Sequence, residues 1–183
     1  MSRFPDFEFS HTGLHAFDPD RMIQFYKDVF GFIETDRGVV HGTIPVVFLS
    51  RSARDHHQVV IAGGRTAPID SVLLNQLSFR LASLVELRAA YEKVIGVDGA
   101  ADIRCITHGN AFSVYFRDPE GNKLELFTDS PWYVEQPVLE PFDFTQSDED
   151  ILSATHELLK DMPGFKPFEE WSVNLQQRLE SAE

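Results

Sequence analysis

The sequence predicts an α+β fold in which two βαβββ modules form a curved mixed sheet around a central cup, followed by a helical C-terminal tail. Three observations support this prediction: an internal repeat, a hairpin with a proline–glycine turn, and an acidic helix start beyond the repeat. The modules are expected at residues 8–66 and 72–129 of a domain that spans residues 1–129, and the tail at residues 130–183.

The internal repeat has an offset of 65 residues. Residues 76–97 align with residues 11–32 without a gap, and the expected helix N-caps coincide, Asp18 with Ser83. The apolar positions of the two helices and the glycines that end them coincide as well. A match of this kind indicates that one supersecondary unit occurs twice.

The first module reads as a strand, a helix and three further strands. Alternation indicates a strand from Phe7 to Phe17, and Asp18-Pro19 then supplies a cap and a first-turn proline for a helix that ends at Gly31. The remaining strands are expected near residues 38–41, 46–50 and 58–62, and the linker to the second module at residues 63–71.

The second module ends in a hairpin with strands near residues 112–116 and 123–127. Residues 118–122, DPEGN, form the turn, because proline fixes one backbone angle and glycine accepts a positive φ. Alternation places the apolar side chains of the hairpin on one face and Tyr115 and Glu125 on the other. A polar face with a tyrosine and a carboxylate, opposite an apolar face, indicates the lining of a site.

Residues 130–183 lie outside the repeat. Ser147 precedes three acidic residues, which is typical of a helix N-terminus, and this helix is expected to run to about Asp161. A last helix is expected over residues 169–179. Trp132-Tyr133 directly follows the final strand of the repeat, where it either closes the mouth of the cup or packs in the ordinary way.

The composition is that of a soluble globular chain, with 183 residues, 43% of them apolar and 16 of them Phe. A formal net charge of −13 argues against nucleic acid as a partner, since phosphate binding needs clustered Lys and Arg. No apolar run approaches the roughly 20 residues of a membrane span, and the first residues lack a signal-peptide pattern. The single Cys105 fits a reducing compartment, so the expected location is cytoplasmic.

The hairpin sequence YFRDPEGNKLELF resembles the last hairpin of the vicinal oxygen chelate superfamily, which includes glyoxalases, fosfomycin-resistance proteins and type I extradiol dioxygenases. The DPEGN turn is typical of the superfamily and does not by itself indicate the chemistry. The resemblance implies that the two modules surround a metal-binding cup. It also implies that Glu125 is a metal ligand and that Tyr115 acts beside the metal, as in extradiol dioxygenases.

Three histidines complete the expected site. His11 should face the cup, because alternation places it opposite the strand face that packs under the helix, and the resemblance gives it the place of the first metal ligand. His56-His57 resembles the double-histidine segment of extradiol dioxygenases, which implies that His57 is the acid–base group; a His pair at a strand edge near solvent is the alternative. His108 resembles a further histidine of these enzymes, with a spacing to Tyr115 that is two residues shorter than usual.

Two positions of the repeat bear on the chemistry. Gln76 stands where the extradiol enzymes have a second histidine ligand, and its amide oxygen is a weaker and harder donor than imidazole toward Fe(II). Either Gln76 is the third ligand, as in some glyoxalases, or a histidine or water takes its place. Glu125 maps back to Val60, which cannot ligate a metal. Glyoxalases carry carboxylates at both positions, so Val60 favours the three-ligand extradiol plan.

The resemblance therefore implies an extradiol-type dioxygenase that opens a catechol-like aromatic diol with O2 and non-haem Fe(II), with Mn(II) or another divalent ion as the alternative metal. The expected protein is a homo-oligomer that contacts neither nucleic acid nor membrane. A glyoxalase-like, metal-dependent lyase or isomerase is the second hypothesis. The third is a metal-free member of the fold that binds an aromatic ligand.

Overall fold

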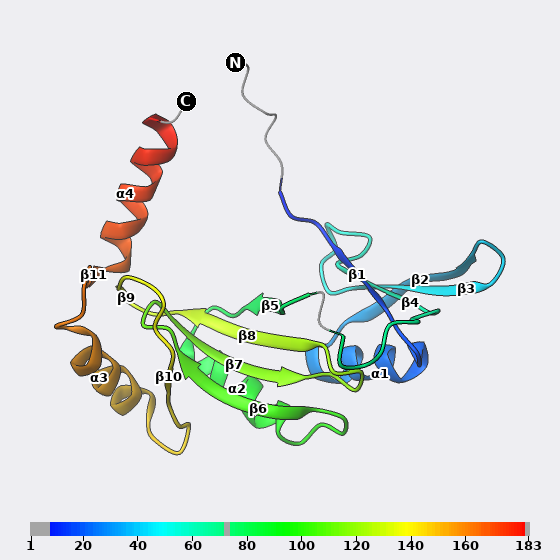
Figure 1. The fold of residues 1–183 in the computed structure, drawn as a ribbon, viewed down its shortest axis with the longest axis horizontal. Coiled ribbons are helices and arrows are strands. Elements are labelled where there is room, and N and C mark those ends of the chain that lie inside the picture. Colours follow the sequence, from blue (N-terminus) through cyan, green and yellow to red (C-terminus); the bar gives the residue numbers. More distant parts are fainter. Residues whose placement is uncertain (1–7, 72–73, 182–183) are drawn as a thin grey trace. The chain divides into compact units, whose positions relative to one another are not determined.

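The computed structural model describes residues 8–71 and 74–181. Its elements follow the predicted order, βαβββ twice and then a tail (Figure 1). The chain forms two compact units. Unit 1 consists of Met1–Asn75, Lys93–Ala101 and Arg117–Lys123, and unit 2 consists of Gln76–Glu92, Asp102–Phe116 and Leu124–Glu183.

Unit 1 contains a four-stranded sheet with the strand order β1-β4-β3-β2. β1 pairs in parallel with β4, and the other neighbours are antiparallel. The strands are β1 (Thr12–His15), β2 (Ile33–Val40), β3 (Ile44–Ser50) and β4 (Val59–Ala62). The predicted first strand was too long at both ends, because residues 8–11 and 16–17 lie outside β1, and Phe7 lies outside the described residues.

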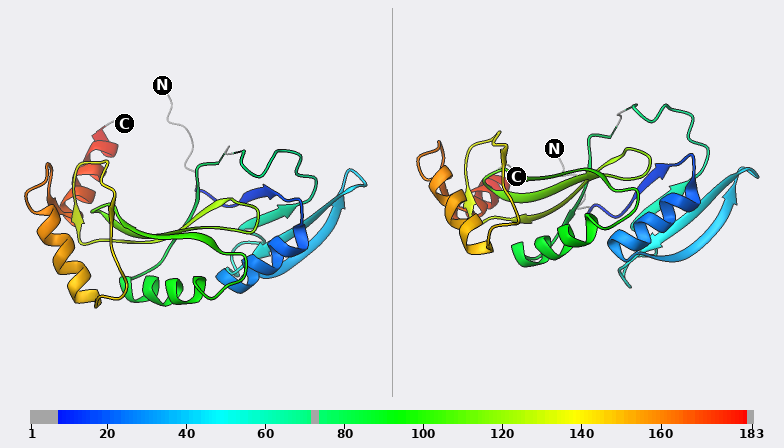
Figure 2. Two further views of the ribbon diagram at one scale, coloured as in Figure 1. Left: turned by 60° about the horizontal axis from the view of Figure 1, so that its bottom comes forward. Right: turned by 90° about the horizontal axis from the view of Figure 1, so that it is seen from below.

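Helix α1 (Pro19–Phe30) lies against one face of this sheet (Figure 2). Its start is as predicted, since Asp18 Oδ1 accepts a hydrogen bond from the Arg21 backbone N–H at 3.1 Å. Its end is also as predicted, because Gly31 takes the left-handed conformation with φ 69°. The buried face of the helix comprises Met22, Ile23, Phe25, Tyr26, Val29 and Phe30.

Unit 2 contains most of a five-stranded sheet with the order β10-β6-β7-β8-β5. Its strands are β5 (Leu77–Arg80), β6 (Ala101–Thr107), β7 (Ala111–Arg117), β8 (Lys123–Asp129) and β10 (Glu140–Pro141). Helix α2 (Leu84–Val94) runs along one face of the sheet (Figure 2). Ser83 caps this helix as the repeat predicts, because its Oγ accepts from the Glu86 backbone N–H at 3.2 Å.

The internal repeat is kept in the strand register. In the parallel pair of β1 and β4, Gly13 lies opposite Val60. In the parallel pair of β5 and β8, Ser78 lies opposite Glu125. A shift of 65 residues relates Gly13 to Ser78, and the same shift relates Val60 to Glu125. The register therefore confirms that Val60 is the counterpart of Glu125.

The hairpin turn has a well-defined polar interior. Asp118 Oδ1 accepts from the backbone N–H groups of Glu120 and Asn122 at 3.0 and 2.9 Å. Its Oδ2 accepts from the Asn122 side chain and from the Tyr26 hydroxyl of α1. Burial raises the pKa of Asp118, while these hydrogen bonds oppose the shift. The turn is therefore joined to α1 within unit 1.

The tail of unit 2 holds two helices, as predicted, and three short strands that the sequence did not indicate. They are β9 (Trp132–Tyr133), β10, α3 (Asp148–Leu159), β11 (Lys166–Pro167) and α4 (Phe168–Ser181). Ser147 caps α3, and Ile151 and Leu159 bury its inner face. α4 contacts β9 and β11 and has no buried residue. Within residues 8–71 and 74–181, no helix combines the length and the apolar character needed to cross a membrane.

Candidate functional site

Glu125, in the middle of β8, accepts the hydrogen bonds of a polar cluster in unit 2. Its side chain is 6% exposed. Gln76 Nε2, just before β5, donates to Glu125 Oε2 at 2.7 Å, and the Ser78 hydroxyl donates to the same oxygen. The parallel pairing of β5 with β8 brings these three residues together, because it places Ser78 directly beside Glu125. A buried carboxylate is thus stabilised by at least two neutral donors.

Tyr115 extends the cluster to His108. His108 Nε2 lies 2.9 Å from the Tyr115 hydroxyl, and its Nδ1 lies 2.8 Å from the Val138 carbonyl oxygen. Because a carbonyl only accepts, His108 Nδ1 carries a proton and donates to Val138. Burial, together with the hydrogen bond to Glu125, raises the pKa of Tyr115 to about 12. The phenol is therefore protonated at neutral pH.

Unit 1 brings His11 and His57 together. Their ring centroids are 4.3 Å apart, and His57 Nδ1 lies 3.0 Å from His56 Nδ1. The ring of Phe48, on β3, contacts His57 at a centroid distance of 5.1 Å. Burial, followed by the proximity of His11 and His56, lowers the pKa of His57. His57 is thus neutral at pH 7 and can accept a proton.

The predicted site residues fall into these two groups. His11 and His57 belong to unit 1, and Gln76, Glu125, Tyr115 and His108 belong to unit 2. Each group is held together by direct contacts within its own unit. His11 precedes β1 by one residue and is exposed, so it does not lie within the strand that the sequence predicted for it.

Two serines of this region were not predicted. Ser78 has a sequence signal, since alternation places it on the same face as Gln76 and the repeat places it beside Glu125. Ser113 lies two residues before Tyr115 on β7 and is fully buried. A hydrogen bond between Ser113 and Tyr115 opposes the rise in the Tyr115 pKa, so Ser113 belongs to the surroundings of the phenol.

The donors around Glu125 fit a hard divalent cation. A carboxylate, the Ser78 hydroxyl and the Gln76 amide lie within hydrogen-bond distance of one another. Rotation of the Gln76 amide presents its carbonyl oxygen in place of Nε2, and such oxygen donors suit Mg²⁺, Mn²⁺ and Ca²⁺. Among the described residues, no group of three or more His, Cys, Asp or Glu side chains converges on a metal position.

The aromatic pair after β8 packs against the tail. Tyr133 stacks on Trp171 of α4, with ring centroids 5.1 Å apart and planes 12° apart. Trp132 contacts His156 of α3 at 5.4 Å. Of the two roles expected for this pair, the structure shows ordinary packing.

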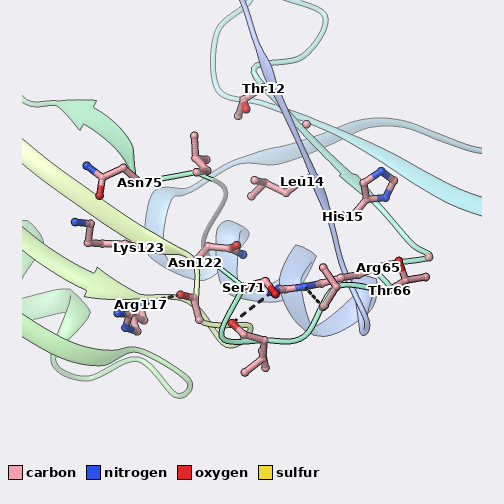
Figure 3. A pocket seen from close by; sticks show the side chains of 16 residues that line it. Thr12, Leu14, His15, Arg65, Thr66, Ser71, Asn75, Arg117, Asn122 and Lys123 are labelled. Carbon is pink, nitrogen blue, oxygen red and sulfur yellow. Dashed lines mark hydrogen bonds between the residues drawn. The ribbon is translucent and has the colours of Figure 1, made fainter.

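A cavity of about 530 Å³ lies in unit 1 along β1 (Figure 3). His15 belongs to its lining, whereas none of the six predicted site residues does. The cavity lining and the two side-chain clusters described above thus share no residue.

Two βαβββ modules, with the buried Glu125 on the last strand of the second module, define a glyoxalase-like α+β protein. The model of the Glyoxalase/Bleomycin resistance protein/Dioxygenase superfamily matches residues 8–126, and the chain belongs to this family. The match confirms the resemblance to the vicinal oxygen chelate proteins. Residues 127–183, which include α3 and α4, lie outside the matched region.

Solved structures show the same fold. A glyoxylase/bleomycin resistance protein/dioxygenase domain from Frankia sp. EAN1pec has a TM-score of 0.59 and 20% identity, covering 69% of this chain and 100% of that one. The fosfomycin resistance protein FosX from Mesorhizobium loti has a TM-score of 0.54 and 22% identity, covering 67% and 92%. FosX from Listeria monocytogenes, as a variant complexed with Mn(II) and 1S,2S-dihydroxypropylphosphonic acid, has a TM-score of 0.53 and 17% identity, covering 65% and 90%. A search of curated proteins found no match.

Proposed function

We propose that this chain is a metal-dependent extradiol-type dioxygenase that opens a catechol-like ring beside its two hydroxyl groups, with O2 as co-substrate. Fe(II) is the proposed metal, and His11, Gln76 and Glu125 are its proposed ligands. The observation that carries the proposal is the cluster in which the buried Glu125 meets Gln76, Ser78 and the Tyr115–His108 pair. It combines a carboxylate ligand with side chains that can donate and accept protons.

The number of carboxylates supports the dioxygenase over a four-ligand lyase. Val60 occupies the register position in β4 that Glu125 occupies in β8, so the first module offers no carboxylate there. Three side-chain ligands, two of them neutral and one a carboxylate, leave coordination positions of the metal open for a chelating diol and O2. The bound metal would supply the positive charge that acidifies the diol and the redox centre that oxygen cleavage requires.

The residues of the chain have separate roles in this proposal. His57, whose pKa is lowered, takes the proton of a diol hydroxyl at Nε2 or Nδ1. The Tyr115 hydroxyl, protonated at neutral pH, has one proton to donate; on substrate binding it would turn that proton from Glu125 to an oxygen of the substrate, while its contact with His108 Nε2 fixes the phenol. Val138 fixes the His108 ring by accepting at Nδ1. The free Cys105 takes no part, since burial raises its pKa to about 11.

A glyoxalase-like lyase or isomerase is the second candidate, and the donor set around Glu125 favours it. Gln76 offers a neutral oxygen atom at the position where the extradiol enzymes have an imidazole, and the Ser78 hydroxyl lies beside it; oxygen donors select Mn(II) or Mg(II) rather than Fe(II). In this reaction Glu125 or His57 moves a proton between two carbons of a chelated substrate, and O2 is not consumed.

Anaerobic reconstitution with Fe(II) or Mn(II), followed by catechol turnover with an oxygen electrode, tests the proposal. The dioxygenase requires one metal per chain and oxygen uptake equal to ring-opened product. His11→Ala and Glu125→Ala should each abolish stoichiometric metal, whereas Glu140→Ala, an exposed glutamate of β10, should retain it. Metal binding with turnover of a hemithioacetal and no oxygen uptake would establish the lyase instead. Full metal content in either ligand variant would contradict the proposed site. The same preparation gives the assembly state, which we propose to be a homo-oligomer in the cytoplasm.

A further inference from the structure

The cavity along β1 has the size of a small-molecule site. Its volume of about 530 Å³ falls within the roughly 300–1,000 Å³ of ligand pockets. All four residues of β1, Thr12–His15, line one side. The remainder is lined by residues of the linker between 64 and 71, by Leu74 and Asn75, and by Arg117 and residues 121–123, and every lining residue belongs to unit 1.

The lining carries positive charge in a strongly acidic chain. Arg65, Arg117 and Lys123 line the cavity, and no Asp or Glu does so, although the chain has a net charge of −13. In the view of Figure 3, Arg117 and Lys123 lie on one side of Leu14, and Arg65 lies on the other. Arg65 is paired with Glu120, and the Arg117 Nη1 donates to the Gly121 carbonyl at 2.7 Å. These bonds hold the guanidinium groups in place at the wall of the cavity.

The edge of β1 adds backbone donors. β1 is the outer strand of its sheet, and the Thr12 and Ala16 N–H groups donate to Gln58 and Ala62 on the inner side. Backbone direction alternates along a strand, so the N–H groups of Gly13 and His15 point outward, away from β4, whereas that of Leu14 points toward β4. Among the described residues no backbone acceptor of these two outward N–H groups is found, so they can bind a ligand in the cavity.

The sheet face beside this edge is also open at Gly13. A Cβ built at Gly13 would meet no atom closer than the Val60 Cβ at 4.0 Å, so the space above this residue is open. His15 Nδ1 bonds the Gly63 carbonyl at 3.1 Å, which leaves Nε2 directed away from that bond. Because glycine has no side chain, a ligand can approach the β1 backbone closely at Gly13.

We propose that this cavity binds the oxyanion group of a small molecule, a phosphate or carboxylate group, between the β1 edge and the Arg117–Lys123 side of the lining. Backbone N–H groups and Lys or Arg side chains together are the donors that such groups select. The inference does not depend on the metal site, because no residue of the proposed centre lines the cavity.

Amide chemical shifts of the full chain test the inference. Inorganic phosphate and acetate are titrated separately, each against sodium chloride at the same ionic strength. At least one oxyanion should shift the amide signals of Gly13 and His15 saturably, while chloride should not. The oxyanion that binds more tightly indicates whether the natural ligand carries a phosphate group or a carboxylate group.

Lys123→Gln removes one charge from the lining and should weaken oxyanion binding about tenfold, while Lys123→Arg should retain it. Lys93→Gln, an equal charge change at an exposed site on α2, is the control and should bind as the parent does. Unchanged Gly13 and His15 signals with both oxyanions would overturn the inference. Equal shifts with chloride, or equal affinity in Lys123→Gln, would overturn it as well.

Discussion

Arg65 and Glu120 form an ion pair with Nη1 and Oε2 3.2 Å apart and side chains only 9% and 5% exposed. Glu120 Oε1 also accepts from the backbone N–H of Asp18 at 2.8 Å, immediately before α1. One carboxylate therefore joins the linker, the hairpin turn and the start of the first helix. The DPEGN turn therefore has a structural role. This role explains why the turn is typical of the superfamily's fold and does not indicate which reaction a member catalyses.

The stability of unit 1 should depend on this pair. Arg65→Met leaves the Glu120 charge buried without its partner and should lower the free energy of unfolding by about 3 kcal/mol. The double variant Arg65→Met/Glu120→Gln should recover part of that loss, because no charge remains buried. Urea unfolding measures both. Glu34→Gln, at an exposed pair with Arg37, is the control and should cost less than about 1 kcal/mol. Equal costs for Arg65→Met and Glu34→Gln would contradict the argument.

The two helices of the tail should differ in their contribution to stability. Ile151 of α3 is 1% exposed, so Ile151→Ala should lower the free energy of unfolding by about 2–5 kcal/mol. Val173 of α4 is 51% exposed, and Val173→Ala should change it by less than about 0.5 kcal/mol. Denaturant unfolding of both variants checks this. A large cost at Val173 would show that α4 is covered by a partner in solution.

Much of the fold could be predicted because local signals agree with the packing. Asp18, Gly31, Ser83 and Ser147 cap their helices as predicted, since caps depend on hydrogen bonds within a few residues. The repeat predicted two equivalent βαβββ modules, and the structure confirms them, since the β1–β4 and β5–β8 pairs have the same register. The short strands β9, β10 and β11 were not predicted, because two-residue pairings depend on tertiary contacts rather than on periodicity.

The candidate site could be predicted in part. Alternation predicted that Glu125 and Tyr115 share the polar face of the hairpin, and the hydrogen bond between them agrees with this; the burial of Glu125 was not predicted. Ser78 and Ser113 were not identified, because serine has no distinctive pattern and its role depends on what lies opposite it. The charged cavity was not predicted either. Its lining comes from β1, the linker and the turn, which no local sequence signal connects.

The raised pKa of Tyr115 should appear in alkaline stability. The phenol has an ordinary pKa of 10.0 and a folded value of about 12, so between these pH values the folded chain keeps a proton that the unfolded chain loses. The free energy of unfolding should therefore fall as the pH rises from 10 to 12. Tyr115→Phe should make that fall shallower, and part should remain, because burial also raises the pKa of Tyr26.

Urea unfolding at several pH values measures this slope. Tyr91→Phe, which removes a phenol elsewhere in unit 2, is the matched control for the loss of a hydroxyl. The comparison concerns the slope alone, because Tyr115→Phe also removes hydrogen bonds at every pH. A Tyr115→Phe slope equal to that of the parent would show that the phenol titrates normally.

Gln76→His distinguishes the two candidate reactions. The change replaces the amide that now donates to Glu125 Oε2 by an imidazole, a stronger donor for Fe(II), so iron affinity should rise by about tenfold or more in either case. If the native reaction is ring cleavage, catechol turnover and oxygen uptake should be kept or increased. If the native reaction is a lyase reaction built around an oxygen donor, metal should bind more tightly while lyase turnover falls. Gln176→His, at an exposed position of α4, controls for a new histidine as such. A parent and a Gln76→His variant that both fail to bind metal would exclude both reactions.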